Sequence, residues 1–368
     1  MKSVLVIGGA TLDTIIQYEQ METLVHQSAR KQQSYLLLEE GSKIEVTEQN
    51  SFSGGGATNA AMSFKRQGFD VKLFCKIGQD LTGEVVLQEL QDGGIDTSNV
   101  RYSAKVGTAN SFVVPSLKGD RTVFAYRGAN TTLTAQEMPY EVVPAVDFMY
   151  VTSLSRAAAK AMPEIVACAQ QHQVPVAVNP GVSQLQLGGG FLHSALSGID
   201  ILILNFDEAK QFMASLLQID DHLREALEQQ TPRAEMADKL LDSETVFQDM
   251  RFSLRQFFQE VMRLGPKTVV VTDGDQGVYV ATPERLYYHR SIQIDNVVNT
   301  LGAGDAFGSS FVGALHQGQS IADAIRWGVV NSAAVIQHPD AKTGLQSVEA
   351  IQQRVSQLET DWLVEKVW

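Results

Sequence analysis

The sequence predicts an α/β protein with a mostly parallel sheet at its core. Short apolar runs that do not alternate with polar residues recur along the chain, which is typical of strands buried on both faces of a sheet. Segments with helical periodicity lie between many of these runs. Gly8 and Gly9 close the first run, where a strand must give way to a turn. Strands and helices that alternate in this way form parallel βαβ units.

The elements can be placed in order along the chain. The first strand is the apolar run 4–7, directly before the two glycines. Later apolar runs predict strands over residues 71–77, 148–152, 174–179, 199–204 and 268–272. Apolar residues at helical spacing predict helices over residues 57–67, 83–92, 157–172, 206–217 and 306–316.

Two stretches break this rhythm and predict a second, smaller sheet. Residues 14–52 and 99–127 contain segments in which polar and apolar residues alternate, which is typical of antiparallel strands with one face in water. They could pair into one small sheet that forms a lid over the core, or they could form separate surface hairpins. In the first case the chain divides into a lid of residues 14–52 and 99–127 and an α/β core of residues 1–13, 53–98 and 128–368. The alternating segments are 43–46, 111–115 and 121–126.

A long insertion near residues 210–262 is rich in Gln, Glu, Leu and Met and has Pro232 in its middle. We expect two helices there, between a strand and the next crossover. They could be solvated helices or an oligomer contact.

The composition limits the function classes. The chain has 368 residues, a formal net charge of −13 and 44% hydrophobic residues. The negative charge argues against nucleic acid and anionic membranes as partners, and no apolar run approaches the roughly 18 residues of a membrane span. The two cysteines, Cys75 and Cys168, lie in apolar surroundings that predict buried thiols rather than a disulfide. We therefore expect a soluble, cytoplasmic protein.

The sequence Asn-Thr-Leu-Gly-Ala-Gly-Asp at 299–305 is the most informative motif. Its small residues precede a predicted helix, and the free amides of a helix start suit an anion such as phosphate. Asp305 would lie beside that anion, where a carboxylate is useful as a base that takes a proton from an attacking hydroxyl. The alternative is an ordinary helix start with an acidic residue in its first turn.

Two further features lie near the N-terminus. A glycine run, Gly54-Gly55-Gly56, opens a helix with Asn59 in its first turn, and glycines allow a ligand to touch the backbone. The run is neither a Walker A loop nor a good dinucleotide fingerprint, and a capped glycine turn is the alternative. Asp13 follows the first strand, where an Asp could accept two sugar hydroxyls or could be an ordinary loop residue.

Two motifs follow later strands. Asn205 and Glu208 are three residues apart at a helix start, so they could bind a hydrated magnesium ion, form a capping box, or do both. Thr272 and Gly274, with Gly277 shortly after, make a tight corner between two strands. Such a corner could receive a nucleotide along its open backbone, or could be a plain hairpin.

In this order the motifs resemble those of the ribokinase-like sugar kinases, the PfkB family, over nearly the whole chain. Residues 54–59 with 76–83 resemble the N-terminal signature, and 299–305 resemble the C-terminal signature. Asn205 to Glu208 match the Asn-x-x-Glu motif, and 272–277 are similar to the nucleotide-binding corner. The resemblance implies a ribokinase-like three-layer α/β/α core with a mostly parallel sheet and a small β-sheet lid.

The resemblance also implies a reaction, in which an ATP-dependent enzyme phosphorylates a hydroxymethyl group of a small sugar. Asp305 would be the base, and the amides of Gly302, Ala303 and Gly304 the anion hole. The implied sugar-binding residues are Asp13, Gly55, Gly56, Asn59 and Arg127. Asn205 and Glu208 would organise Mg²⁺ and phosphate, and Asn205 would also bind the nucleotide. The implied ATP-site residues are Thr272, Gly274, Gly277 and Asn331.

Some expectations stay open at this point. The family often has Asp where this chain has Asn299, so potassium activation is in doubt. The sugar could be ribose-, fructose- or keto-sugar-acid-like, and Tyr126-Arg127 is closer to the ketose and keto-sugar-acid kinases. A nucleoside kinase of the same fold, or a catalytically silent sugar- or nucleotide-binding regulator, are the alternatives. A homodimer formed through the lid is a further possible partner arrangement.

Overall fold

A nine-stranded sheet forms the centre of the computed structural model, which describes residues 1–17, 22–27, 32–115, 121–186, 190–219, 241, 245–247, 250–359 and 362–368. The strand order is β19-β18-β17-β16-β13-β12-β11-β1-β6. Neighbours from β6 to β16 are parallel, and β16 to β19 pair antiparallel at one edge. The strands are β1 (Ser3–Ile7), β6 (Asp70–Phe74), β11 (Phe148–Val151), β12 (Val176–Val178), β13 (Ile201–Asn205), β16 (Thr268–Thr272), β17 (Val278–Ala281), β18 (Arg285–His289) and β19 (Leu363–Val367).

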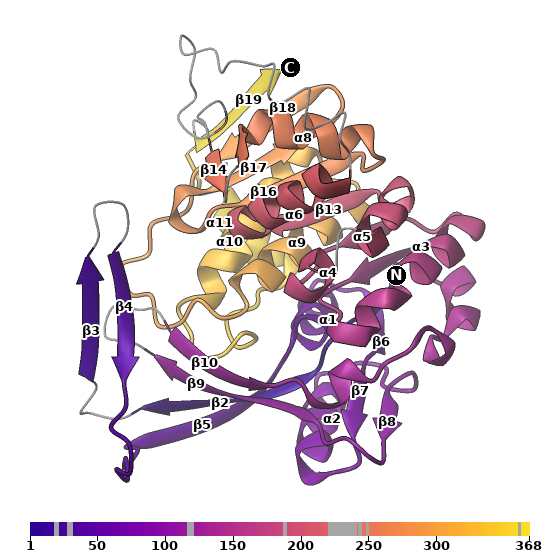
Figure 1. The fold of residues 1–368 in the computed structure, drawn as a ribbon. Coiled ribbons are helices and arrows are strands. Elements are labelled where there is room, and N and C mark those ends of the chain that lie inside the picture. The colour runs from indigo at the N-terminus through magenta and orange to yellow at the C-terminus, as the bar shows by residue number, and fades with distance from the viewer. Residues whose placement is uncertain are drawn as a thin grey trace.

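Helices cover both faces of this sheet, so the core has three layers (Figure 1). Alternate residues of β1 belong to different hydrophobic clusters, Val4 and Val6 to one and Leu5 and Ile7 to the other, because successive strand side chains point to opposite faces. One cluster includes side chains of α1 (Gly56–Arg66), α2 (Leu81–Asp92), α9 (Ala303–His316), α10 (Ile321–Val335) and α11 (Val348–Val355). The other includes side chains of α3 (Met162–Gln171), α4 (Val182–Gln186), α5 (Gly190–Ala195), α6 (Phe206–Ile219) and α8 (Leu254–Arg263).

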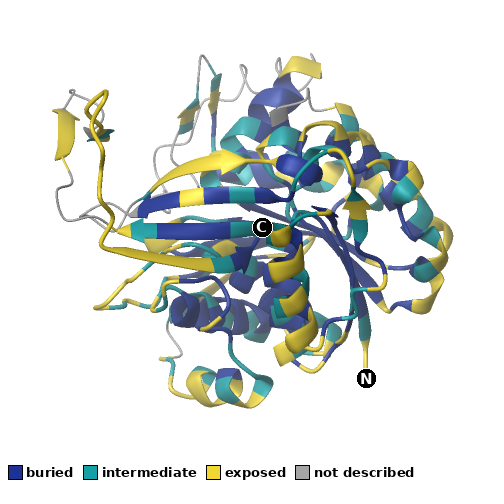
Figure 2. Ribbon diagram, turned by 90° about the horizontal axis from the view of Figure 1, so that it is seen from below, coloured by how far each residue is buried: buried dark blue, intermediate teal, exposed yellow. Residues whose placement is uncertain are grey.

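A smaller, four-stranded sheet extends from the core (Figure 1). Its order is β10-β9-β2-β5, with strands from both stretches that the alternation singled out. Figure 2 shows that exposed and buried residues occur along the same strands of this sheet. Separate surface hairpins are therefore excluded for these four strands, whereas the division into lid and core as units stays a prediction. The strands are β2 (Thr11–Gln17), β5 (Glu48–Gly54), β9 (Ala109–Pro115) and β10 (Arg121–Tyr126).

The N-terminal stretch differs from the expectation in two places. Its strands β3 (Glu22–Gln27) and β4 (Gln32–Leu37) form a two-stranded hairpin of their own. The alternating segment 43–46 is not a strand, and its residues are exposed. A four-residue alternating segment is too short to specify a partner strand. The pattern alone therefore predicted more strand than this stretch contains.

Three predicted elements have different bounds in the structure. The run 71–77 is broken at Cys75 into β6 and β7 (Lys76–Gly78), which pairs with β8 (Arg101–Ser103). The predicted helix 157–172 is a 3₁₀ turn, η4 (Arg156–Ala161), followed by α3, because Pro163 lacks an N–H and fits only the first turn of an α-helix. Helix α9 begins at Ala303 rather than at 306.

The predicted two-helix insertion is only partly described. Its described part contains the end of α6, a short hairpin of β14 (Thr245–Phe247) and β15 (Met250–Phe252), and α8. The hairpin corrects the expectation of helices alone. Residues 220–240, 242–244 and 248–249 of the insertion lie outside the described part of the chain.

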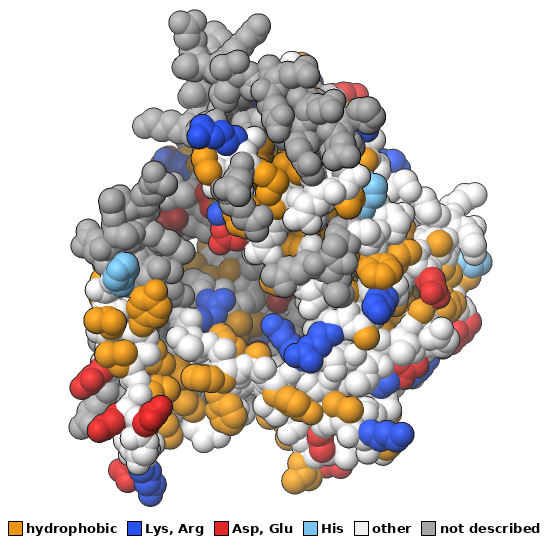
Figure 3. Space-filling view, in the orientation of Figure 1, with side chains coloured by type: hydrophobic (Ala, Val, Ile, Leu, Met, Phe, Trp, Pro, Cys, Tyr) orange, Lys and Arg blue, Asp and Glu red, His pale blue; other side chains and the backbone are white. Residues whose placement is uncertain are grey.

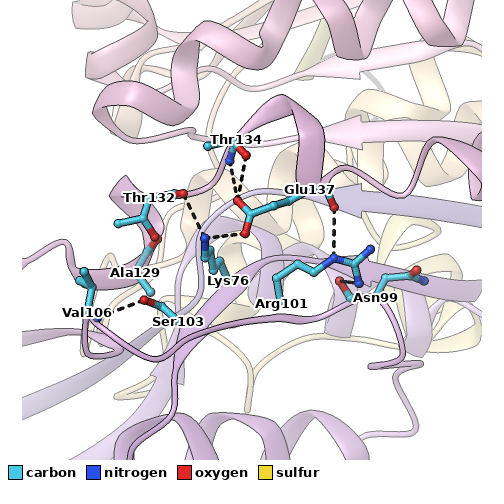
Figure 4. A network of polar contacts seen from close by, with 9 residues as sticks. All are labelled: Lys76, Asn99, Arg101, Ser103, Val106, Ala129, Thr132, Thr134 and Glu137. Carbon is cyan, nitrogen blue, oxygen red and sulfur yellow. Dashed lines mark hydrogen bonds and ion pairs between the residues drawn. The ribbon is translucent and has the colours of Figure 1, made fainter.

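A polar network fastens the segment after the small sheet to the core (Figure 4). Lys76 donates to the carbonyl of Thr132 and forms an ion pair with Glu137, with Nζ 2.6 Å from Oε1. The Glu137 carboxylate also accepts the amide of Thr134, and its carbonyl accepts from Arg101. These bonds tie residues 132–137 to β7 and β8, and they satisfy a lysine that is largely buried.

The cysteines are free thiols, with Cys75 buried, as expected, and Cys168 only partly buried. Among the described helices none is long and apolar enough to cross a membrane.

Candidate active site

The start of α9 is open to an anion. Gly302 is its N-cap residue in the left-handed region, with φ 77°, and a Cβ there would lie 2.3 Å from the Ala341 side chain. The amides of Gly302 and Gly304 donate to no residue in the described part of the chain, and the Ala303 amide has only a long bond of 3.4 Å to the Thr300 carbonyl. A Cβ on Gly304 would meet open space. Free amides in this arrangement are a site for phosphate-like charge.

Asp305 lies in the first turn of α9 and faces the glycine run. Its Oδ2 accepts a hydrogen bond of 2.8 Å from Asn59 Nδ2. Burial raises the pKa of Asp305, the Asn59 hydrogen bond lowers it, the neighbouring Asp13 charge raises it, and the Lys342 charge lowers it. A Cβ on Gly56 would lie 3.3 Å from Asp305 Oδ1 and 3.1 Å from the Thr152 side chain, tight contacts that glycine avoids. The structure therefore brings the two ends of the predicted site together across 246 residues.

Asn59 has one side-chain atom without a partner. The residue is 4% exposed, and its Oδ1 is buried with no hydrogen-bond partner among the described residues. A buried acceptor without a donor costs about 1–3 kcal/mol, so a ligand hydroxyl at this position would gain by satisfying it. Asn59 Oδ1 is therefore independent support for a polar ligand beside Asp305.

Asp13 lies in strand β2 and not in a loop, which corrects the expected setting. Its Oδ1 accepts a short hydrogen bond from Ser111 of β9, and its Oδ2 lies against Gly54, where a Cβ would come within 1.9 Å. Burial raises the pKa of Asp13, whereas the Ser111 hydrogen bond and the charges of Lys342 and Arg127 lower it. Asp13 is thus a buried carboxylate at the base of the small sheet.

Backbone geometry at the glycine run explains its composition. Gly55 has φ 95°, and a Cβ there would lie 2.5 Å from the Gly9 carbonyl. On the other side of this turn, Asn130 accepts from the Ala10 amide at 3.1 Å and donates to the Ala10 carbonyl at 2.9 Å. The loops that follow β1 and precede α1 are therefore packed backbone against backbone, which brings the glycine run beside Asp13.

Asn205 and Glu208 form a reciprocal capping box at the start of α6. The Asn205 amide donates to Glu208 Oε2 at 2.9 Å, and the Glu208 amide donates to Asn205 Oδ1 at 2.8 Å. The pKa of Glu208 is raised to about 7, mainly by burial and also by the charges of Asp305 and Asp207, while the hydrogen bond from the Asn205 amide lowers it. The capping reading is confirmed. In the described part of the chain no three acidic, Cys or His side chains could together hold a metal ion.

A cavity of about 310 Å³ joins the corner after β16 to the start of α9. The corner is a hairpin between β16 and β17, and Gly277 has φ 113° where a Cβ would lie 2.3 Å from the His289 carbonyl. Thr272, Gly274 and Gly277 line this cavity together with Ala303 and Gly304. Its wall is mainly apolar, with Val278, Ile292, Ile294, Val297, Phe307, Val329, Ala333 and Ile336. A second cavity of about 300 Å³, lined by Asn205, Asp207, Glu208 and Thr272, adjoins it.

Asn331 does not join this cluster. Its side chain is fully buried, where Nδ2 donates to Ser310 at 2.7 Å and Oδ1 accepts the Gln346 amide at 2.9 Å. The neighbouring Ser332 and Ala333 line the cavity instead. Helical periodicity explains the difference, since adjacent residues of α10 point to different sides of the helix.

Three residues of the cluster were absent from the sequence prediction, namely Ser111, Thr300 and Lys342. Ser111 binds Asp13, and Thr300 accepts from Arg121 of the small sheet. Lys342 is 5% exposed, and its charge lowers the pKa of both Asp13 and Asp305. Ser111 and Lys342 lie outside the motifs, and Thr300 lies within 299–305 but had no role assigned to it, because each acts through contacts with distant segments. Figure 3 shows the hollow between the small sheet and the core, with basic and acidic side chains at its wall.

Comparison with known proteins identifies the family. The pfkB family of carbohydrate kinases matches residues 5–241 and 245–347. The chain belongs to this family. Membership confirms the expected family and the expected enzyme class, an ATP-dependent sugar kinase.

Relatives of this PfkB kinase support the same fold. The ribokinase of Staphylococcus aureus (strain COL) is 26% identical over 315 residues, which are 85% of this chain and 91% of that protein. The Arabidopsis thaliana ribokinase complexed with ribose and ATP superposes with a TM-score of 0.73 at 18% identity, covering 96% of this chain and 99% of that one. A nucleoside kinase of Methanocaldococcus jannaschii gives 0.70 at 16% identity, covering 97% and 99%. The ribokinase-like fold is thereby confirmed.

Proposed function

We propose that this kinase transfers the γ-phosphoryl group of ATP to a hydroxymethyl group of a small sugar that binds between Asp13 and Asp305. One observation carries the proposal: Asn59 donates to Asp305 Oδ2 at 2.8 Å and keeps its own Oδ1 buried without a partner. The amide thereby orients the carboxylate and offers an acceptor to a sugar hydroxyl on the same side. A site of this kind needs a hydroxyl-bearing ligand beside a base.

In the proposed step, Asp305 takes the proton of the sugar hydroxyl. The hydroxyl oxygen then forms a bond to the γ-phosphorus while the bond from that phosphorus to the ADP oxygen breaks. Burial raises the pKa of Asp305, which makes the ionised carboxylate a stronger proton acceptor. Charge on the transferred group would be met by the amides of Gly302, Ala303 and Gly304, so positioning and electrostatics supply most of the catalysis.

The sugar would be held by short, directional contacts. Asp13 offers carboxylate lone pairs to two hydroxyls, and Gly55 and Gly56 let the ring approach the backbone. Arg127 lies close enough for its charge to lower the pKa of Asp13. Because a buried carboxylate left without donors is costly, such a site favours polyols over apolar analogues.

The nucleotide would occupy the cavity between the β16–β17 hairpin and α9. Its apolar wall suits a purine ring, and the open corner at Thr272, Gly274 and Gly277 suits the ribose and phosphates. The phosphates would then end at the free amides of α9, which line the same cavity.

Magnesium fits this arrangement as a partner of the nucleotide. Glu208 and Asn205 supply oxygen ligands at the adjoining cavity, and Mg²⁺ commonly keeps several waters and binds through one or two carboxylates plus phosphates. The ion would neutralise phosphate charge during transfer. Glu208, with a pKa raised to about 7, is poised to release its proton when a cation binds.

A homodimer through the small sheet would cover an exposed aromatic surface. Phe112 and Phe124 are cross-strand neighbours that are 49% and 52% exposed, and Tyr126 is 52% exposed two residues further along β10. Phe112 adjoins Ser111 in β9, so it lies on the face opposite to the Asp13 contact. Sedimentation of the protein and of a Phe124→Lys variant tests this arrangement, which a monomeric unaltered protein would contradict.

The decisive experiment is an ADP-release screen across pentoses, hexoses, keto-sugar acids and nucleosides, with Asp305→Asn as the background. We expect turnover with one of the sugars. Turnover with nucleosides alone would favour the nucleoside-kinase alternative. If the protein binds sugar or nucleotide by calorimetry but releases no ADP with any acceptor, the silent regulator is the better function.

A further inference from the structure

A buried lysine with defined partners lies next to the proposed sugar site. Lys342 is in the segment that follows α10, and it is 5% exposed. Its Nζ donates to Ser53 Oγ and lies 3.2 Å from Glu89 Oε1 of α2. Glu89 Oε2 in turn accepts the Ser53 amide at 2.9 Å. Three distant segments therefore close one small ring of polar contacts around the ammonium group.

The backbone around Lys342 is anchored. Asp340 Oδ1 accepts the amides of Lys342 and Thr343, both at 2.8 Å, and the Leu345 amide donates to the Lys342 carbonyl at 3.0 Å. Arg66 of α1 also donates to the carbonyls of Thr343 and Leu345. A lysine is seldom buried without a strong reason, since the cost of removing its charge from water must be offset by partners.

The partner Ser53 connects Lys342 to the substrate residues. Ser53 directly precedes Gly54, and the Asp13 carboxylate lies against Gly54. In the sheet register Ser53 pairs with Leu12, the residue before Asp13. A shift of Ser53 would therefore move the backbone on which the Asp13 carboxylate rests, and with it the start of the glycine run.

The charge of Lys342 also reaches the two carboxylates of the proposed reaction. It lowers the pKa of Asp13 and of Asp305, which burial raises. Among the described residues, the charged or titratable groups that face Lys342, Asp13 or Asp305 are Glu89, Asp340, Arg127, Tyr150 and Glu208. Carboxylates outnumber cations in this set. Removing the charge of Lys342 should therefore raise the pKa of both Asp13 and Asp305.

We propose that Lys342 is a positioning residue of the kinase reaction, which holds the glycine run beneath Asp13 through Ser53 and Glu89 and supplies the buried positive charge that Asp13 and Asp305 face. The inference rests on the proposed function of these two carboxylates. It gives the C-terminal segment a role in the sugar side of the site, far along the chain from the residues that would bind the sugar.

The test compares Lys342→Met, Lys342→Arg and Glu89→Gln in steady-state kinetics over pH. We expect Lys342→Met to lower kcat/KM for the sugar about 10- to 100-fold, with KM for ATP nearly unchanged. The acid limb of its kcat/KM profile should move to higher pH, because the charge that favoured ionised carboxylates is gone. Glu89→Gln should move this limb to lower pH, and Lys342→Arg should restore most of the activity.

Lys76→Met is the matched control, because it removes a buried lysine from the ion pair with Glu137, outside the charge set named above. We expect it to lower the Tm without moving the acid limb. The inference is overturned if Lys342→Met behaves like this control. Should Lys342→Met not fold, Lys342→Arg and Glu89→Gln carry the test, and an unmoved limb in Glu89→Gln overturns it. If the unaltered protein phosphorylates no sugar, the proposed function itself fails, and this inference falls with it.

Discussion

The two sides of the proposed site would recognise their ligands by different means. The sugar side, made of Asp13, residues 54–59 and Asp305, consists of buried polar side chains with short contacts to one another. The nucleotide side is the cavity between the β16–β17 hairpin and α9, where an apolar wall and glycine backbone dominate. Because directional hydrogen bonds discriminate between ligands more strongly than apolar contacts do, the sugar side should set specificity.

The two sides should also differ in how well they tolerate substitutions. A change on the sugar side leaves a buried polar group without a partner, whereas a change in the nucleotide cavity mainly alters apolar area. The sugar side is therefore where single substitutions should have the largest effects. The following predictions, from the largest expected effect to the smallest, test that difference.

Replacing Asp305 with Asn should abolish most turnover. The variant keeps the size of the side chain but cannot accept the proton, and loss of a general base costs on the order of 10²–10⁴ in rate. Binding of ATP, measured by calorimetry, should stay close to that of the unaltered protein. The control is Asp323→Asn, another first-turn aspartate, at the start of α10. Near-normal turnover of Asp305→Asn in a coupled ADP assay would show that Asp305 is not the general base.

Replacing Asp13 with Ala should weaken the binding of the sugar and leave the binding of the nucleotide unchanged. Each lost charge-assisted hydrogen bond to a sugar hydroxyl should cost about 1.5–3 kcal/mol. We expect KM for the sugar to rise and KM for ATP to stay nearly constant. Asp96→Ala serves as the control, because Asp96 pairs with Lys72 in another part of the core. A rise in KM for ATP alone would mean that the two sides are assigned the wrong way round.

Glu208 should make stability depend on pH. Its pKa in the folded protein, about 7, exceeds the ordinary value of 4.5, so the folded state binds this proton more tightly. The stabilisation of the folded state by this proton is therefore fully present below pH 4.5, and it is lost as the pH rises through about 7. Scanning calorimetry of the magnesium-free protein should give a Tm that falls between pH 5 and pH 8, and less so in Glu208→Gln. The exposed Glu84→Gln in α2 is the control, and an equal fall in all three proteins would contradict the prediction.

The smallest expected effect concerns Asn299 and is a weak response of turnover to potassium. Its Nδ2 donates to the Pro339 carbonyl at 2.9 Å, and its Oδ1 accepts the Leu301 amide at 3.0 Å. The amide thus joins two segments directly, whereas a carboxylate could not donate to Pro339 and would need a cation between the two oxygens. Turnover in potassium and in a large organic cation should differ by less than about 2-fold, the scale of one weak hydrogen bond.

Asn299→Asp should lose activity without potassium and recover it with potassium. Strong potassium activation of the unaltered enzyme would show that backbone oxygens suffice for the ion.

Local features of the site could be predicted because local physics produces them. The capping box of Asn205 and Glu208 needs only residues three apart, and the start of α9 needs only small residues before a helical run. Asn331 was predicted to line the ATP site, and the structure buries its side chain elsewhere, for the opposite reason. Whether a residue of α10 faces the cavity or the core depends on how the helix is rotated against α9, and no short motif encodes that rotation.

The sequence by itself determined the order of strands and helices, the glycine turns and the acidic residues at the ends of strands, since periodicity and backbone freedom act over a few residues. Only the tertiary structure decided which of these meet. The contact of Lys342 with Ser53 spans 289 residues, and that of Asp13 with Ser111 spans 98. Such pairs form because strand pairing and helix packing bring the segments together, and the partners are chosen by burial, where an unpaired polar group is costly.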